Sequence, residues 1–397
     1  MKKGFAFMLS LVLMFSAVPV HASHNTSRIQ DDSIVAGYYL AQVIELIMTR
    51  YMGDEITIEY LFEAALRGMV EELDEFSNYL SAAELQQFTR DLGGSLMGIG
   101  INMRMRADNY VEITRVLPNS PAEQIGVMAG DVILYLDGQS ASGMTMDDIR
   151  DIIGNPDNDR VLIKLQRESR VVTFDILKGE ISSPTVLVER FENIPESRGV
   201  DGVSCVGCTD QYRYVQISSV GLSTGNDLRT AIRQMRYEGV TGILIDLRGN
   251  TGGYLDITID IANQLVPQGV VLQTINQAGR TRTYSSTLQE QPFENIVVLV
   301  NRFTASAAEV IASALQDSEV AIIIGEQTFG KGLVQSVYPM PTGGALKITT
   351  EKYFRRNGGE INNIGVAPCI EVGRHLSASL QDPVLRRGIE VLVGHDQ

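Results

Sequence analysis

Histidine is nearly absent from the part of the chain that could build an active site. The four His residues are His21, His24, His375 and His395, so none lies between residues 24 and 375. A Ser-His-Asp triad would therefore need a His from one end of the chain, and the HExxH pattern of many zinc enzymes does not occur. Acid–base chemistry in the middle of the chain must come from Lys, Glu, Asp or Tyr.

Lysine is also scarce, and one lysine has an unusual setting. Beyond the first residues the chain has only Lys164, Lys178, Lys331, Lys347 and Lys352. Most of them fit solvated surface charges, but Lys331 lies between two glycines, just after an apolar segment that predicts a buried strand. Glycines allow a tight backbone path near other groups. A lysine shielded from water there has its charged form disfavoured, which lowers its pKa toward that of a general base.

Ser306 lies between an apolar strand candidate that ends at Val300 and a small-residue segment that predicts a helix. One interpretation is that Ser306 only caps this helix. The same position also suits a nucleophile, because free N–H groups and the positive end of the helix dipole would stand beside an attacked carbonyl group. From the residues alone, both interpretations stay open.

A glycine-rich turn, residues 246–253, follows a second predicted buried strand. In α/β proteins the sites gather at this end of the strands. A phosphate-binding loop is the competing interpretation, but no Lys-Ser or Lys-Thr pair follows the glycines. A turn that offers N–H groups to an oxyanion is the better interpretation.

The elements that must position these residues divide the chain into regions. Strand and helix patterns alternate from residue 214 onward, which predicts an α/β core with largely parallel strands. Residues 96–179 show short alternating strands, whereas residues 35–93 show the three-and-four spacing of helices. We therefore predict a mixed α/β multidomain chain with four regions: a signal peptide (1–22), a helical region (23–93), a PDZ-sized domain (94–180) and an α/β core with its tail (181–397).

The first residues indicate export. Lys2 and Lys3 precede an apolar run, Gly4–Val18, and cleavage after Ala22 fits the pattern of a signal peptide. An uncleaved membrane anchor is the alternative, although the run is short for a bilayer span of about 20 residues. Export through a cleaved signal would place the protein in a bacterial periplasm.

Net charge and cysteine content limit the partners and the kind of scaffold that the chain can have. The net charge of −15 argues against a nucleic-acid partner, because an acidic surface repels phosphates. Cys205, Cys208 and Cys369 are too few for a disulfide-built scaffold. The Cys205–Cys208 pair has no His nearby that would complete a zinc site, so a local disulfide is the simpler expectation.

Four segments resemble, in order, the motifs of the carboxy-terminal processing peptidases, also called tail-specific proteases. They are Leu247–Gly253 (LRGNTGG), Val300–Glu309 (VNRFTASAAE), Gly325–Gln335 (GEQTFGKGLVQ) and Ala345–Tyr353 (ALKITTEKY). The middle region resembles a PDZ domain, because Pro121-Ala122 and Gly130-Asp131 lie where that family has the same dipeptides. The resemblance covers nearly the whole chain after the signal.

The resemblance implies a role for each matched residue. Ser306 corresponds to the nucleophile, Lys331 to the base and Gln335 to a glutamine that orients the lysine. Backbone N–H groups of Ala307 and of Gly252 or Gly253 would form the oxyanion hole. The PDZ loop made of Gly98, Ile99, Gly100 and Ile101 would bind the carboxylate of a substrate's C-terminus, by strand addition.

The implied protein is an exported serine endopeptidase that needs no metal or cofactor. Its partners would be protein or peptide substrates with free C-termini, and an adaptor protein and a homodimer fit the family. Three positions depart from the motifs: Ala308 replaces a serine, Cys369 replaces an Asp, and Ile153 stands where an Arg is common, with Arg150 or Arg160 as possible substitutes. A silent PDZ scaffold and an amidase or esterase are the competing hypotheses.

Overall fold

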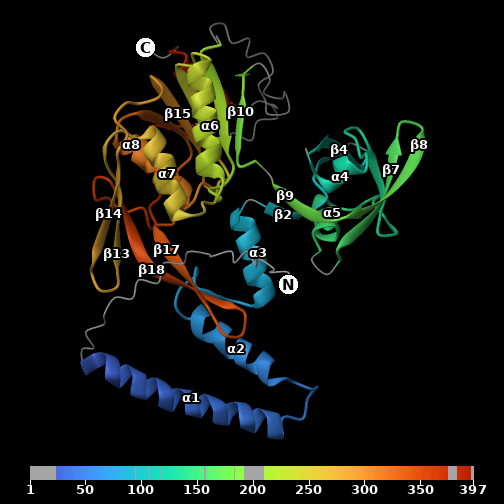
Figure 1. Ribbon diagram of the computed structural model, residues 1–397, viewed down its shortest axis with the longest axis vertical. Helices are drawn as coiled ribbons and strands as arrows, with labels where there is room; N and C mark the ends of the chain where they lie inside the picture. Colours follow the sequence, from blue (N-terminus) through green and yellow to red (C-terminus); the bar gives the residue numbers. More distant parts are fainter. Residues whose placement is uncertain are drawn as a thin grey trace, which may run out of the picture. The chain divides into compact units, whose positions relative to one another are not determined.

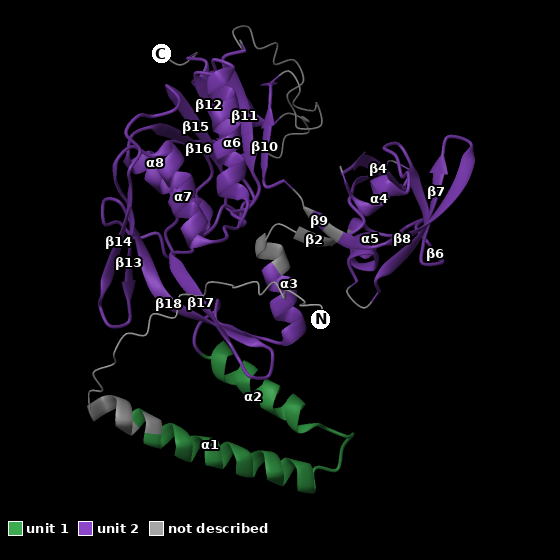
Figure 2. Cartoon of the chain, in the orientation of Figure 1, with its two compact units in different colours: residues 1–72 green, residues 73–397 purple. Residues whose placement is uncertain are grey.

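Two compact units make up the chain, Met1–Glu72 and Leu73–Gln397 (Figure 2). The computed structural model describes residues 24–394, except positions 94, 107, 118, 156–157, 183, 192–209 and 374–381. The predicted signal segment and the Cys205–Cys208 pair lie outside the described residues. No helix in the described part of the chain is long and apolar enough to cross a membrane.

The first unit consists of helices α1 (His24–Arg50) and α2 (Ile58–Glu71). Thr57 begins α2 because its side chain accepts the N–H of Tyr60 at 3.1 Å. The predicted helical region 23–93 also contains strand β1 (Asn78–Leu80) and helix α3 (Ala82–Gly93), and both belong to the second unit.

A six-stranded sheet forms the centre of the second unit (Figure 1). Its order is β10-β11-β12-β15-β16-β19, and the pairs from β11 to β19 are parallel, which confirms the predicted α/β core. The strands are β10 (Val186–Glu189), β11 (Tyr212–Ile217), β12 (Gly242–Asp246), β15 (Asn295–Val300), β16 (Ala321–Gly325) and β19 (Ile370–Glu371).

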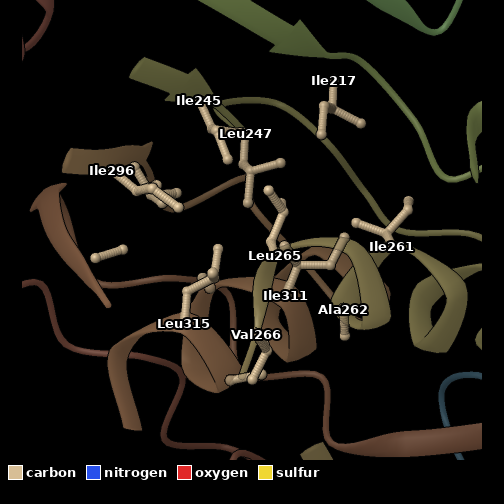
Figure 3. Close-up of a cluster of buried hydrophobic side chains, with 14 of the residues drawn as sticks. Ile217, Ile245, Leu247, Ile261, Ala262, Leu265, Val266, Ile296, Ile311 and Leu315 are labelled. Atoms are coloured by element: carbon tan, nitrogen blue, oxygen red, sulfur yellow. The ribbon is translucent and has the colours of Figure 1, made fainter. Parts of the chain in front are cut away.

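Helices cover both faces of this sheet because its strands are apolar on both sides. Three helices, α6 (Thr224–Tyr237), α7 (Leu255–Leu265) and α8 (Ala307–Asp317), pack with Ile245 on one face. Figure 3 shows part of this cluster. The other face, with Leu244, packs against α9 (Pro383–Leu392). The carboxyl ends of β12 and β15 therefore lead into the two segments that carry the candidate site.

A second, antiparallel sheet was not predicted. Its order is β1-β18-β13-β14, with β17 also paired to β18. The new strands are β13 (Gly269–Asn276), β14 (Thr281–Ser286), β17 (Leu333–Pro339) and β18 (Ala345–Arg355). Strand β17 begins just after Lys331 and contains the end of the third motif, and β18 carries the fourth motif, so this sheet positions one side of the site.

The PDZ region contains the strands that its sequence predicts. Its sheet order is β3-β4-β5-β7-β8, with the short β6 beside β5. A separate antiparallel pair, β2 (Ser95–Gly98) and β9 (Gly179–Ser182), joins the ends of the region. The remaining elements are β3 (Ile101–Met105), β4 (Val111–Val116), α4 (Pro121–Gln124), β5 (Val132–Leu136), β6 (Gln139–Ser140), α5 (Met146–Gly154), β7 (Arg160–Arg167) and β8 (Arg170–Leu177).

The three departures from the motifs all fit local structure. Ala308 is fully buried in the first turn of α8. Cys369 donates its N–H to the carbonyl oxygen of Ile323 at 2.7 Å and leads into β19, so the tail still adds to the sheet. Ile153 packs into the apolar core of the PDZ region. Arg160, at the start of β7, pairs with Asp175.

Candidate active site

Ser306 has a backbone conformation that few residues other than glycine adopt. Its φ is 55° and its ψ is −119°, at the start of α8. Such a conformation persists only where the surroundings hold it. Here the N–H of Ala305 donates to the carbonyl of Asn250 at 2.9 Å, and the N–H of Ser306 donates to Glu309 Oε2 at 2.8 Å.

Ser306 and Glu309 form a capping box at the start of α8. The N–H of Glu309 also donates to the carbonyl oxygen of Ser306 at 2.9 Å. The hydroxyl group of Ser306 is hydrogen-bonded to Tyr353 of β18, whose hydroxyl also donates to the carbonyl oxygen of Lys331. Burial, together with the charge of Glu309, raises the pKa of Tyr353 well above its usual value, so the phenol stays protonated. A helix cap therefore does not account for all the contacts of the Ser306 side chain, which also reaches Tyr353.

Lys331 lies in the same cavity as Ser306. This cavity has a volume of about 470 Å³, and its lining includes Gly252, Gly253, Ser306, Ala307, Lys331, Gln335, Lys347 and Tyr353. The Lys331 amine lies 4.7 Å from the centre of the Phe76 ring. Burial, and then the charge of Lys347, lowers the pKa of Lys331, as the sequence predicts for a general base.

Glu309 connects the backbone of Ser306 to the backbone of Lys331. Its buried carboxylate accepts the N–H groups of Ser306 and Lys331 on Oε2, both at 2.8 Å. Its Oε1 accepts the N–H of Gly330 at 2.7 Å and the hydroxyl of Thr328 at 2.5 Å. One side chain thus fixes the spacing of the two candidate catalytic segments, and sequence reasoning assigned it no role.

Of the two N–H groups in the glycine-rich turn that could bind an oxyanion, only one is free to do so. The N–H of Gly252 donates to Asn250 Oδ1 at 2.9 Å and is therefore occupied. The N–H groups of Gly253 and Ala307 have no hydrogen-bond partner among the described residues. At Gly253, with φ at 153°, a Cβ atom would lie 2.0 Å from the carbonyl oxygen of Val220, so only glycine fits. Gly253 and Ala307 are the better oxyanion candidates.

Gln335 lies in the cavity, but its amide group is directed to Thr349. Its Nε2 donates to Thr349 Oγ1 at 3.2 Å, and Thr349 Oγ1 donates to Asp74 Oδ1 at 3.2 Å. In the described part of the chain, no hydrogen bond joins Gln335 to Lys331. Burial opposes ionisation of Asp74, but hydrogen bonds from Phe76 and Ser77 hold its pKa below the usual value.

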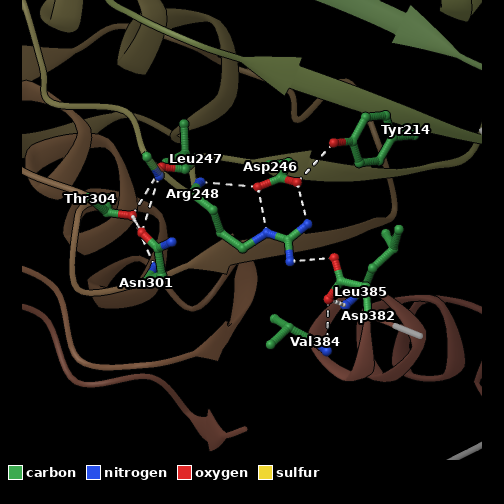
Figure 4. A network of polar contacts seen from close by, with 10 residues as sticks. Tyr214, Asp246, Leu247, Arg248, Asn301, Thr304, Asp382, Val384 and Leu385 are labelled. Carbon is green, nitrogen blue, oxygen red and sulfur yellow. Dashed lines mark hydrogen bonds and ion pairs between the residues drawn. The ribbon is translucent and has the colours of Figure 1, made fainter. Parts of the chain in front are cut away.

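An ion-pair network anchors the glycine-rich turn to the end of the core (Figure 4). The Arg248 guanidinium binds both carboxylate oxygens of Asp246, at 2.9 and 2.7 Å, and one oxygen of Asp382 at 2.7 Å. Tyr214 donates to Asp246 at 2.8 Å. Asp382 also caps α9 by accepting the N–H of Leu385 at 3.1 Å. Burial opposes the Arg248 charge, but the two carboxylates raise its pKa above the usual value.

The predicted PDZ carboxylate loop is a tight turn between β2 and β3. Gly98 ends β2, Ile99 is buried in the PDZ core, and Ile101 begins β3. Gly100 has a φ of 80°, and a Cβ atom there would lie 2.2 Å from the Cβ of Ser120. Strand β3 lies at the edge of its sheet, so an added peptide strand has a position to pair with.

Metal-ligating side chains do not form a cluster in the described residues. Within residues 24–394, leaving out the undescribed gaps, no group of three or more His, Cys, Asp or Glu side chains could hold a metal ion.

Comparison with known proteins defines the class. Residues 211–372 match the model of peptidase family S41, and residues 112–167 match that of the PDZ domain. The carboxyl-terminal-processing protease of Synechocystis sp. is 30% identical over 308 residues, which cover 77% of this chain and 69% of that protein. The chain therefore belongs to peptidase family S41 and is a serine-type peptidase with a PDZ domain.

Other relatives are also named as carboxyl-terminal processing proteases. The carboxy-terminal processing protease CtpB of Bacillus subtilis is 30% identical over 362 residues, 90% of this chain and 71% of that protein. The solved structure of the photosystem II D1 C-terminal processing protease matches with a TM-score of 0.51 at 29% identity, over 88% of this chain and 90% of that chain. The relatives are thus processing proteases of C-termini.

Proposed function

We propose that the protein is an exported serine endopeptidase that recognises the C-terminal tails of protein substrates and cleaves them with Ser306 and Lys331. One observation carries the proposal: Ser306, Lys331, Gly253 and Ala307 all line one cavity. Export rests on the signal-like residues 1–22, and tail recognition rests on the PDZ region with its edge strand.

The chemistry follows from this arrangement. The Ser306 hydroxyl adds to the carbonyl carbon of the peptide bond, and its proton passes to the neutral Lys331 amine. The N–H groups of Gly253 and Ala307 stabilise the negative charge on the former carbonyl oxygen. When the C–N bond breaks, Lys331 returns the proton to the leaving amine and an acyl-enzyme remains. Water then attacks the ester, with Lys331 again accepting the proton, and Ser306 is restored.

Gln335 and Tyr353 would support this chemistry. The tyrosine hydroxyl bridges the Ser306 side chain and the Lys331 carbonyl oxygen, so it fixes their spacing. Gln335 would orient Lys331 only after its amide group leaves Thr349.

Tail recognition predicts a preference for a free carboxylate. An unfolded substrate that ends in an apolar free C-terminus is expected to be cleaved about tenfold faster than the same substrate with an amidated end. The reason is that the amide removes the charge the PDZ loop would bind, worth about 1–2 kcal/mol. Fragments are measured by mass spectrometry at substrate concentrations below KM.

Two results would contradict the proposal in different ways. Binding of the tail without cleavage under any condition favours the PDZ scaffold. Equal rates on both substrates retain a peptidase but remove tail recognition.

A homodimer is proposed for the first unit. The large apolar residues of α1 are mostly exposed, among them Ile34, Tyr38 and Leu46, each 60% or more. With 27 residues, α1 is about 40 Å long, enough for a helix-pair interface. Light scattering is expected to give twice the mass of one chain, and Leu46→Glu to give the single mass. A wild-type protein with the single mass at all concentrations would rule out the dimer.

A further inference from the structure

Lys347 is a second lysine in the candidate active-site cavity. It lies on β18, opposite Asn78 of β1 and Val337 of β17, and its side chain is half-buried. Its ammonium lies 5.3 Å from the centre of the Phe88 ring of α3. Within the described part of the chain, no ion pair or hydrogen bond joins the Lys347 side chain to another residue. A partly buried cation without a carboxylate partner needs an explanation.

The carboxylates near the two lysines are already engaged elsewhere. Asp74 accepts hydrogen bonds from Phe76, Ser77 and Thr349. Glu309 accepts four hydrogen bonds, two of them on each oxygen. Glu75 is exposed. The cavity therefore holds two lysine side chains and no carboxylate that pairs with either of them.

The two lysines are not equivalent. Burial lowers the pKa of both, but only Lys331 is also shifted downward by the charge of its neighbour. Asp74, Glu309 and Glu75 act on Lys331 in the opposite direction, and Asp74 favours the charged form of Lys347. The neighbouring Tyr353 stays neutral. Each ammonium group also lies over an aromatic face, Lys331 over Phe76 and Lys347 over Phe88, so this contact does not distinguish the two lysines. The charge of Lys347 is the contribution that lowers the pKa of Lys331 alone, so Lys331 is the lysine expected to be neutral.

We propose that Lys347 is a positioning residue whose positive charge keeps the Lys331 amine neutral and able to accept a proton. Two like charges repel more strongly in a cavity shielded from water than in bulk solvent, so the protonated form of Lys331 is the form that Lys347 destabilises. This inference rests on the proposed role of Lys331 as the general base.

The charge of Lys347 affects only the acid limb of the pH profile. Neutral Lys331 accepts the Ser306 proton, so kcat/KM rises with pH along an acid limb and then reaches a plateau. Without the Lys347 charge, protonated Lys331 is more stable. The limb then moves to higher pH, while the plateau is unchanged.

The test compares three substitutions on one strand. Lys347→Met removes the charge and keeps an apolar stem over Phe88, and Lys347→Arg keeps the charge. Lys352→Met is the matched control, because Lys352 lies on the same strand but is exposed and outside the cavity. In Lys347→Met, kcat/KM on the acid limb is expected to fall by roughly fivefold without loss on the plateau. The Arg variant and the control should follow the wild-type profile.

Several results would overturn the inference. An unchanged pH profile in Lys347→Met would do so, as would a rise in KM restricted to substrates with acidic side chains, which would make Lys347 a substrate-binding residue. If Lys347→Met unfolds, Lys347→Gln provides the same test. Ser306→Ala separates the two proposals: wild-type turnover of this variant would refute the proposed function, whereas an unchanged Lys347→Met profile refutes only the role of Lys347.

Discussion

Ser306→Ala is expected to lower kcat by roughly 10⁴-fold or more while leaving substrate binding within about twofold of wild type. The substitution removes the oxygen that would form the acyl-enzyme, but the cavity and the backbone N–H groups of Gly253 and Ala307 remain. Single-turnover kinetics on an unfolded substrate would measure the loss, and fluorescence anisotropy of a labelled tail peptide would measure binding.

A serine on the same helix provides the control. Ser313 is buried in α8, donates to the carbonyl oxygen of Val310 at 3.2 Å and does not line the cavity. Ser313→Ala should therefore keep kcat within about twofold, at a cost in unfolding free energy of about 1 kcal/mol. If Ser306→Ala retained wild-type turnover, another residue would have to be the nucleophile.

Glu309→Ala is expected to have the second largest effect, on both folding and turnover. It leaves the N–H groups of Ser306, Gly330 and Lys331 and the hydroxyl of Thr328 without their acceptor. Each unsatisfied buried donor costs about 1–3 kcal/mol, and partial rearrangement limits the total loss to about 3–5 kcal/mol. Turnover of the folded fraction should fall about 100-fold, because Ser306 and Lys331 lose their fixed spacing.

Glu309→Gln keeps the size of the side chain but loses part of its capacity to accept hydrogen bonds, so it separates these two contributions. The amide is nearly isosteric, but it can accept on one side only and turns its NH₂ group toward N–H donors on the other. Thermal unfolding and kcat are measured together. Glu319→Gln, at an exposed residue just after the same helix, is the matched control and should change neither stability nor kcat. If stability falls while the folded fraction keeps its kcat, Glu309 supports the fold but does not position the dyad.

The parallel core could be predicted because its signals are local. Continuous apolar runs such as residues 242–247 and 296–300 identify strands buried on both faces, and glycine and serine follow them at the same edge of the sheet. Each predicted site residue of the core then lines the cavity. The family resemblance, not the periodicity, supplied the roles of these residues.

The antiparallel sheet could not be predicted in the same way. Strand β18 mixes polar and apolar residues without the regular alternation that predicts a strand. It pairs with β1, which is more than 260 residues away in the chain. Lys347 acquires its place through this pairing, and Tyr353 acquires its place through the pairing of β18 with β13. Glu309 did have a local signal, because a Ser followed three residues later by a Glu is a helix-start pattern. Its contact with Lys331 spans 22 residues and has no such signal.

The attachment of Arg248 to Asp382 has a consequence for the timing of synthesis. An emerging chain that stops before Asp382 already carries Ser306, Lys331 and the glycine-rich turn, but Arg248 then has only Asp246 to hold it. The turn gains its second attachment only when the residues that begin α9 have been made. The position of the turn therefore depends on a residue made 134 positions later in the chain.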